Sequence, residues 1–175
     1  MRRSWFVPFA LGGLGVLAMV AVLTVGSAAA ARHSDHHGNQ GWHGGEALLR
    51  AELSPSVPSD PAIFGVSPGG APWQLAHARV RLGESGRLDI DVDGLVLTTT
   101  GANPLPDLAA TIYCGGTAAA TTAPVPFSTK GDAHIRTMVT LPAFCPAPAV
   151  LINPATGSSP SSVITTAYIA FDGTA

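Results

Sequence analysis

Proline and glycine break the sequence beyond residue 46 into short segments. The 175 residues include 15 prolines and 20 glycines. The segments between them are rich in Val, Ile, Leu and Thr, and none keeps a helical hydrophobic period over three turns. The sequence therefore predicts an all-β domain. Many short strands with turn signals favour a single antiparallel two-sheet β-sandwich of the immunoglobulin-like kind over residues 47–173.

We expect about ten strands in this domain, some of them irregular. The prolines, Pro55 and Pro154 among them, fall mostly between strands, where a missing N–H group does least harm. The expected strands are 47–53, 63–66, 74–82, 87–98, 108–114, 117–123, 124–129, 132–141, 148–152 and 163–171.

Residues 1–30 resemble a secretory signal peptide. Arg2 and Arg3 precede an apolar run from Trp5 to Val25, and a series of alanines follows. A positive start, an apolar centre and an A-x-A site are typical of such signals. The alternative is an uncleaved membrane anchor over residues 5–25, because the run is long enough to span a bilayer. Either way we expect an exported bacterial protein, secreted or extracytoplasmic.

Residues 31–46 are rich in His and Gly, and we expect a disordered linker there. Neutral imidazoles suit Cu(II), Ni(II) or Zn(II). If cleavage follows Ala30, the new amino terminus, two backbone amides and the third residue's imidazole form a square-planar set. The alternative is a solvated spacer whose histidines are incidental. The candidate metal ligands are His33, His36, His37 and His43.

Charge excludes several classes of protein. Charged residues make up 11% of the chain, against roughly 25% in an average soluble domain, which excludes a highly charged disordered protein. Without residues 1–30, 7 basic residues remain against 11 acidic ones. Because no basic patch remains, we expect no nucleic-acid partner.

One hairpin can be predicted with its register. Residues 76–82 and 87–93 each alternate apolar and polar side chains, and Glu84-Ser85-Gly86 fits a three-residue loop with a left-handed glycine. That loop places opposite charges face to face across the two strands. The expected pairs are Arg81 with Asp89, Arg79 with Asp91, and His77 with Asp93.

A second hairpin and a disulfide are expected around Cys114. Gly115-Gly116 supplies the positive φ angles that a two-residue turn needs. Cys114 and Cys145 are the two cysteines of the chain. In an exported protein a disulfide is favoured over half of a metal or catalytic site.

Two short segments match functional motifs, but a purely structural role is favoured for each. Asp89, Asp91, Asp93 and Gly94 match the opening of a calcium loop, but the twelfth position is Thr100, where the loop needs Glu. The segment 65–69 matches G-x-S-x-G, but the residue after its serine is a proline, which cannot supply an oxyanion-hole N–H. We interpret the first as a strand and the second as a proline-glycine turn.

Two aromatic residues lie near the start of the domain. Phe64 and Trp73 are candidates for stacking on sugar rings, as in carbohydrate-binding modules. Because the chain has few aromatic residues and a small sandwich needs most of them inside, we expect core or staple roles for both.

Three segments resemble secreted bacterial β-sandwich proteins: GRLDIDVDGLVL at 86–97, YCGGT at 113–117 and LPAFCPAPAVLINP at 141–154. With the closing AYIAFDG at 167–173, their order is also similar to CHRD domains. AATIYC at 109–114 lacks the histidines of that family's A-H-I-H-like motif. The resemblance therefore implies a fold, and no activity or site residue.

These observations predict a non-catalytic protein with a structural or interaction role at the cell envelope or outside the cell, where an envelope component or a glycan is a possible partner. One alternative is an extracellular Cu-, Ni- or Zn-binding protein that uses the histidine-rich segment. The other is a carbohydrate-binding module.

Overall fold

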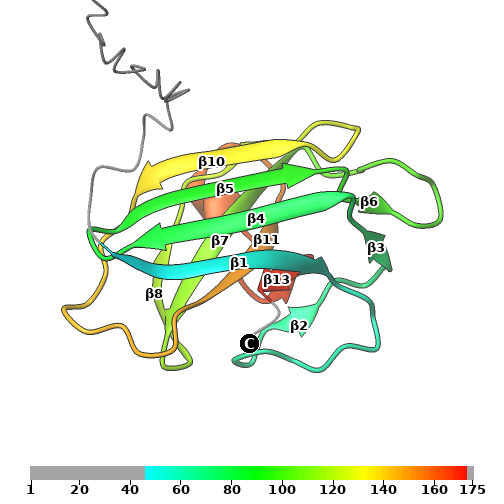
Figure 1. Ribbon diagram of the computed structural model, residues 1–175. Coiled ribbons are helices and arrows are strands. Elements are labelled where there is room, and N and C mark those ends of the chain that lie inside the picture. Colours follow the sequence, from blue (N-terminus) through cyan, green and yellow to red (C-terminus); the bar gives the residue numbers. More distant parts are fainter. Residues whose placement is uncertain (1–45, 173–175) are drawn as a thin grey trace, which may run out of the picture. The chain divides into compact units, whose positions relative to one another are not determined.

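Residues 46–172, which the computed structural model describes, form strands, turns and one short 3-10 helix, with no α-helix (Figure 1). The elements are β1 (Ala47–Pro55), β2 (Ser67–Pro68), β3 (Trp73–Gln74), β4 (His77–Gly83), β5 (Arg87–Asp93), β6 (Val96–Leu97), β7 (Asp107–Cys114), β8 (Thr117–Thr121), β9 (Val125–Pro126), β10 (Ala133–Met138), β11 (Ala149–Ala155), η1 (Pro160–Ser162), β12 (Ala167–Tyr168) and β13 (Ala170–Asp172). The expected all-β class is confirmed.

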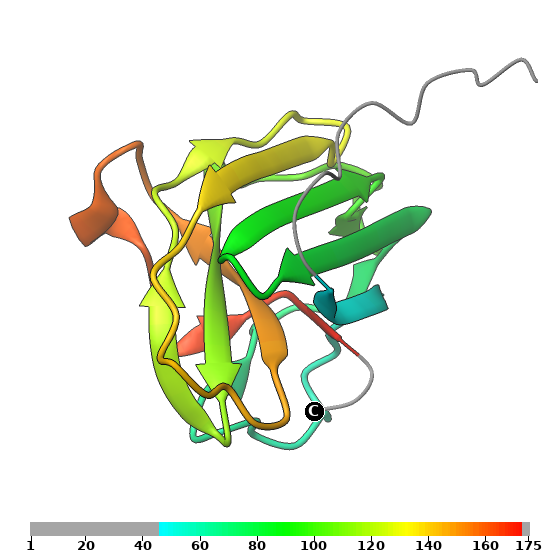
Figure 2. The same cartoon turned by 60° about the vertical axis from the view of Figure 1, so that its left-hand side comes forward.

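Strand β1 joins the two halves of the main sheet. Its first part pairs with β4, and its last three residues, Leu53 to Pro55, pair with β13. Hydrogen bonds therefore connect nine strands into one curled antiparallel sheet in the order β10-β5-β4-β1-β13-β11-β7-β8, with β9 beside β7. In Figure 1 β10, β5, β4 and β1 cross in front of β7 and β11, and Figure 2 shows β7 and β8 steeply inclined to β4 and β5.

The core lies between these two halves. Leu88, Ile90 and Val92 of β5 are at most 2% exposed, and they pack with apolar residues of β4, β7 and β11. Strand β11 is buried along its whole length, because a second apolar cluster around Tyr168 and Leu151 covers its other side. Apolar and acidic residues alternate along β5, because only one of its faces is covered by the core. All residues of β11 are buried, because both of its faces are covered.

Both predicted hairpins are confirmed. Strands β4 and β5 pair with Arg79 opposite Asp91 and His77 opposite Asp93, and Gly86 takes the left-handed conformation at φ 81°. Strands β7 and β8 meet at Cys114 and Thr117. The two glycines of that turn have φ values of 58° and 80°, which a side chain with a Cβ atom adopts only with strain.

Several of the expected strands differ from those in the structure. Residues 63–66 form a tight turn closed by two backbone hydrogen bonds between Ile63 and Val66, because Phe64 and Gly65 both have positive φ. The expected strand 87–98 is divided at Gly94, where φ is 69°. The prolines do fall mostly between strands, as expected, and Pro55 and Pro154 lie near the ends of β1 and β11, where an absent N–H group removes little pairing.

Candidate functional site

The outer face of β4, β5 and β10 carries a group of charged side chains that pair with one another. Asp89 and Asp91 project from β5 on the side opposite to its buried apolar residues. Strand β10 pairs with the free edge of β5 and places His134 opposite Asp91 and Arg136 opposite Asp89. Each carboxylate therefore has a neighbour from each adjacent strand, since Arg79 and Arg81 of β4 lie on the other side.

Asp91 is held from two strands. Arg79 donates from Nε to Oδ2 at 3.0 Å, and its Nη2 forms an ion pair with the same oxygen at 3.0 Å. His134 Nδ1 contacts Oδ1 from β10. Burial opposes the charged form of Asp91, but the hydrogen bonds and charges of His134 and Arg79 outweigh it and lower its pKa. Asp91 is therefore a carboxylate whose two oxygens have different partners.

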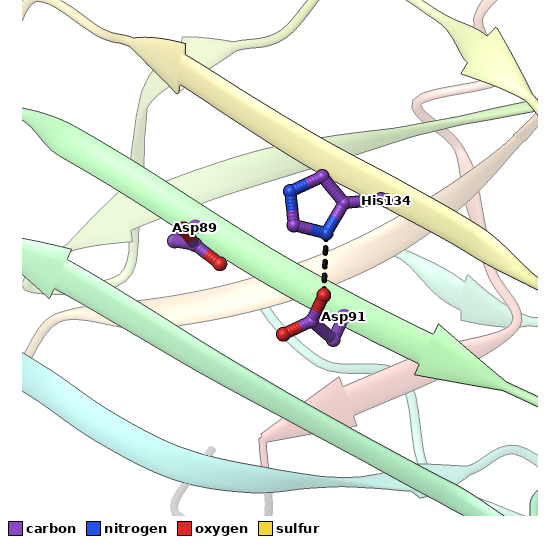
Figure 3. A group of neighbouring side chains, drawn as sticks. All are labelled: Asp89, Asp91 and His134. Carbon is purple, nitrogen blue, oxygen red and sulfur yellow. Dashed lines mark hydrogen bonds and ion pairs between the residues drawn. The ribbon is translucent and has the colours of Figure 1, made fainter. Parts of the chain in front are cut away.

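Asp89 is more enclosed. It is 9% exposed, and Arg136 donates from Nε to its Oδ2 at 3.0 Å. One oxygen of Asp89, one oxygen of Asp91 and a ring nitrogen of His134 lie within 4.8 Å of one another. Figure 3 shows the three side chains together on one side of the sheet. Two carboxylates and an imidazole at this spacing are donors for a divalent ion.

The calcium-loop alternative does not describe this site. The loop requires the carboxylates to wrap around one ion. Here Asp89 and Asp91 lie on an extended strand whose intervening Ile90 is fully buried. The segment that resembles the start of a calcium loop is therefore a paired strand, as the hairpin prediction indicates.

The disulfide is present as predicted. Cys114 and Cys145 are joined, with their Cα atoms 4.7 Å apart. Gly115 N also donates to Pro146 O at 2.6 Å. Together they attach the loop between β10 and β11 to the tip of the β7–β8 hairpin, and this loop carries Phe144, which is 79% exposed.

An apolar pocket of about 530 Å³ lies beside that hairpin tip. Its lining includes Leu48, Phe64, Gly116, Ala147 and Pro148. The Phe64 ring stacks on Tyr113, with ring centroids 4.7 Å apart.

The two aromatic predictions have different outcomes. Trp73 is 6% exposed and belongs to the core, as expected. For Phe64 a core or staple role was expected; at 40% exposed it is not a core residue, and its ring packs on Tyr113 instead. Its positive φ turns the ring outward at a tight turn, and the sequence contains no signal for this beyond the following Gly65.

The G-x-S-x-G segment has no nucleophile elbow. Ser67 and Pro68 form β2, which pairs in parallel with β12, and no α-helix follows among the described residues. The turn is present but lies at Phe64-Gly65, before the serine, so its expected place at proline and glycine is wrong.

The candidate ligands His33, His36, His37 and His43 lie outside the described residues, as do the expected signal peptide or anchor and most of the linker. No helix in residues 46–172 has the length and apolar character needed to cross a membrane. No protein-family model, curated protein or solved structure matches the chain.

Proposed function

We propose that the chain is an exported, non-catalytic interaction domain that binds a saccharide of the cell envelope or extracellular space. In this proposal the two halves of the curled sheet act as the layers of an immunoglobulin-like sandwich, and residues 1–30 direct export. The bond between Cys114 and Cys145 supports export, because disulfides persist in oxidising compartments.

The observation that carries the proposal is the exposed ring of Phe64 at the apolar pocket. Sugar rings have an apolar face that stacks on aromatic rings, and the Phe64–Tyr113 pair offers such a platform. A pocket of about 530 Å³ lies within the usual range for small-ligand sites.

Backbone strain at the same pocket supports a binding role. Phe64 and Ala147 are the two non-glycine residues with positive φ among those described, at 51° and 42°, and both line this pocket. Such conformations cost of order 1–3 kcal/mol each, and they cluster at ligand-binding sites. The pocket therefore combines an exposed aromatic ring with a strained rim.

The test is co-sedimentation of the purified mature protein with insoluble envelope polysaccharide from its native host. We expect binding that Phe64→Ala reduces at least tenfold and that Phe144→Ala leaves unchanged, because Phe144 is exposed but does not line this pocket. Binding that survives Phe64→Ala, or no binding at all, would overturn the saccharide proposal. A rise in reducing ends during incubation would contradict a non-catalytic role, and alkylatable cysteines in protein from the native host would contradict export.

A further inference from the structure

We propose that Asp89, Asp91 and His134 form a binding site for a divalent transition-metal ion, with Zn(II) as the reference ion. The site lies on the outer face of β5 and β10, and it uses none of the residues of the apolar pocket or of the histidine-rich segment. It is therefore independent of the proposed saccharide binding.

The first argument is the convergence of three donors from two strands. Their ligand atoms lie within 4.8 Å of one another. With Zn–N and Zn–O distances of about 2.0–2.2 Å, donors in a tetrahedral shell lie roughly 3.4 Å apart. Side-chain rotations without backbone movement can close this difference, because His134 is on the edge strand of the sheet and its side chain is 42% exposed.

The second argument is the way two arginines hold the carboxylates. Arg79 binds Oδ2 of Asp91, and Arg136 binds Oδ2 of Asp89. Each hydrogen bond restrains one oxygen of its carboxylate and leaves the Oδ1 atom for another partner. In Asp91 that oxygen already contacts Nδ1 of His134. Outer partners of this kind orient metal-binding carboxylates in protein sites.

The third argument concerns the choice of ion. Three arginines border the two carboxylates, since Arg81 lies opposite Asp89 and Arg79 and Arg136 form ion pairs with Asp91 and Asp89. Their charges lower the attraction of the site for any cation. Ca(II) needs six to eight oxygen ligands and binds mainly through charge, so it is disfavoured here. An imidazole with two carboxylates suits Zn(II), Ni(II) or Cu(II), which gain more from nitrogen ligands. A bound ion would replace the direct contact between Asp91 and His134, and water would complete its coordination.

The competing explanation is a charge ladder that binds no ion. Both explanations use the same contacts, so stability measurements on single variants do not separate them. Direct metal binding does, provided that the N-terminal histidines are removed from the measurement. His77 supplies a matched control, because it is an exposed histidine that lies opposite Asp93 in the same sheet.

The experiment uses the exported chain in which His33, His36, His37 and His43 are replaced by Ala. Zn(II) is titrated against a chromophoric chelator, and Co(II) is followed by visible absorption. We expect one Zn(II) per chain, at least tenfold weaker binding after His134→Ala or Asp89→Asn, and unchanged binding after His77→Ala. The Co(II) absorption bands should weaken in the His134→Ala variant and stay unchanged in the His77→Ala variant.

Two results would overturn the site. One is no Zn(II) bound by the histidine-depleted background. The other is binding that His134→Ala and His77→Ala affect equally. Thermal unfolding of each variant without metal shows whether a loss reflects misfolding. If His134→Ala does not fold, Asp89→Asn in the same background decides, and binding that it leaves unchanged rejects the site.

Discussion

Arg79 lies directly opposite Asp91 across the β4–β5 hairpin, and its Nε donates to Oδ2 at 3.0 Å. The loop of Glu84 to Gly86 fixes this register, because a three-residue loop with a left-handed glycine allows one alignment of the two strands. The same alignment puts the apolar side chains of both strands into the core. Turn geometry, charge and hydrophobic pattern therefore agree on a single structure.

The ion pair should contribute little to stability despite its good geometry. The side chains of Arg79 and Asp91 are 52% and 29% exposed, so water and salt screen their attraction. In a double-mutant cycle with Arg79→Ala and Asp91→Ala, we expect a coupling of about 0.2–1 kcal/mol that falls as salt is added. Urea unfolding at neutral pH measures it. A cycle with Arg79→Ala and Glu84→Ala is the control, and equal coupling in both cycles would contradict the prediction.

The register of this hairpin could be predicted because all of its determinants are local. The turn, the alternation and the charge pairs lie within residues 76–93, so no distant contact was needed. The β7–β8 turn at Gly115-Gly116 follows for the same reason. Local geometry and side-chain pattern were sufficient for these two hairpins, whose strands are joined by turns of two or three residues.

The candidate metal site could not be predicted because it joins segments about 43 residues apart. The alternation in residues 132–141 does place His134 and Arg136 on one polar face. This alternation does not predict that β10 pairs with β5, since either edge of the β4–β5 hairpin could accept a further strand. The double role of β1 was missed for a related reason: the change of partner near Leu53 depends on the curl of the whole sheet.

The disulfide should contribute strongly to stability. It links residues 31 positions apart. Closing a loop of that length lowers the entropy of the unfolded chain, and in the chain-entropy model this stabilises the folded state by roughly 3–4 kcal/mol. We expect the double variant Cys114→Ala/Cys145→Ala to lose about that much unfolding free energy in urea. Reduced wild-type protein is the control and should match it. An unchanged urea midpoint after reduction would show that the bond is not structural.

Two glycines with the same backbone angle should respond differently to alanine. Gly86 and Gly65 both have φ +81°, but a Cβ at Gly86 would lie 2.0 Å from Val139 O, whereas nothing lies within 4 Å at Gly65. Both substitutions carry the left-handed penalty of roughly 1–2 kcal/mol. Gly86→Ala must also displace the backbone that donates from Val139 N to Gly86 O. We expect it to destabilise by at least about 1 kcal/mol more than Gly65→Ala. Equal losses in urea unfolding would contradict this.

Asp172 should make the domain less stable as pH rises through the mildly acidic range. Its side chain is fully buried in β13, opposite Leu53. Oδ2 accepts a hydrogen bond from Val150 N at 3.3 Å, but Oδ1 has no partner among the described residues. Burial raises the pKa of Asp172 to about 6, and the Val150 hydrogen bond opposes this in part. In the unfolded chain Asp172 has its ordinary pKa of 3.8 and releases its proton as the pH rises above that value. The folded chain keeps this proton up to a higher pH.

The sign of the effect follows from this difference in proton binding. Between pH 3.8 and about 6 the folded state holds more protons, so unfolding free energy falls with rising pH by at most about 1.4 kcal/mol per pH unit. Above that window the loss is complete. We expect Asp172→Asn to remove this slope in urea unfolding, to stabilise the domain at pH 7.5 and to have little effect at pH 4. Glu84→Gln, in the exposed β4–β5 loop, is the control. Because the pKa of Asp91 is lowered, its effect on stability falls at a pH below this window. The same slope in Asp172→Asn and wild type would show that Asp172 is not the titrating group.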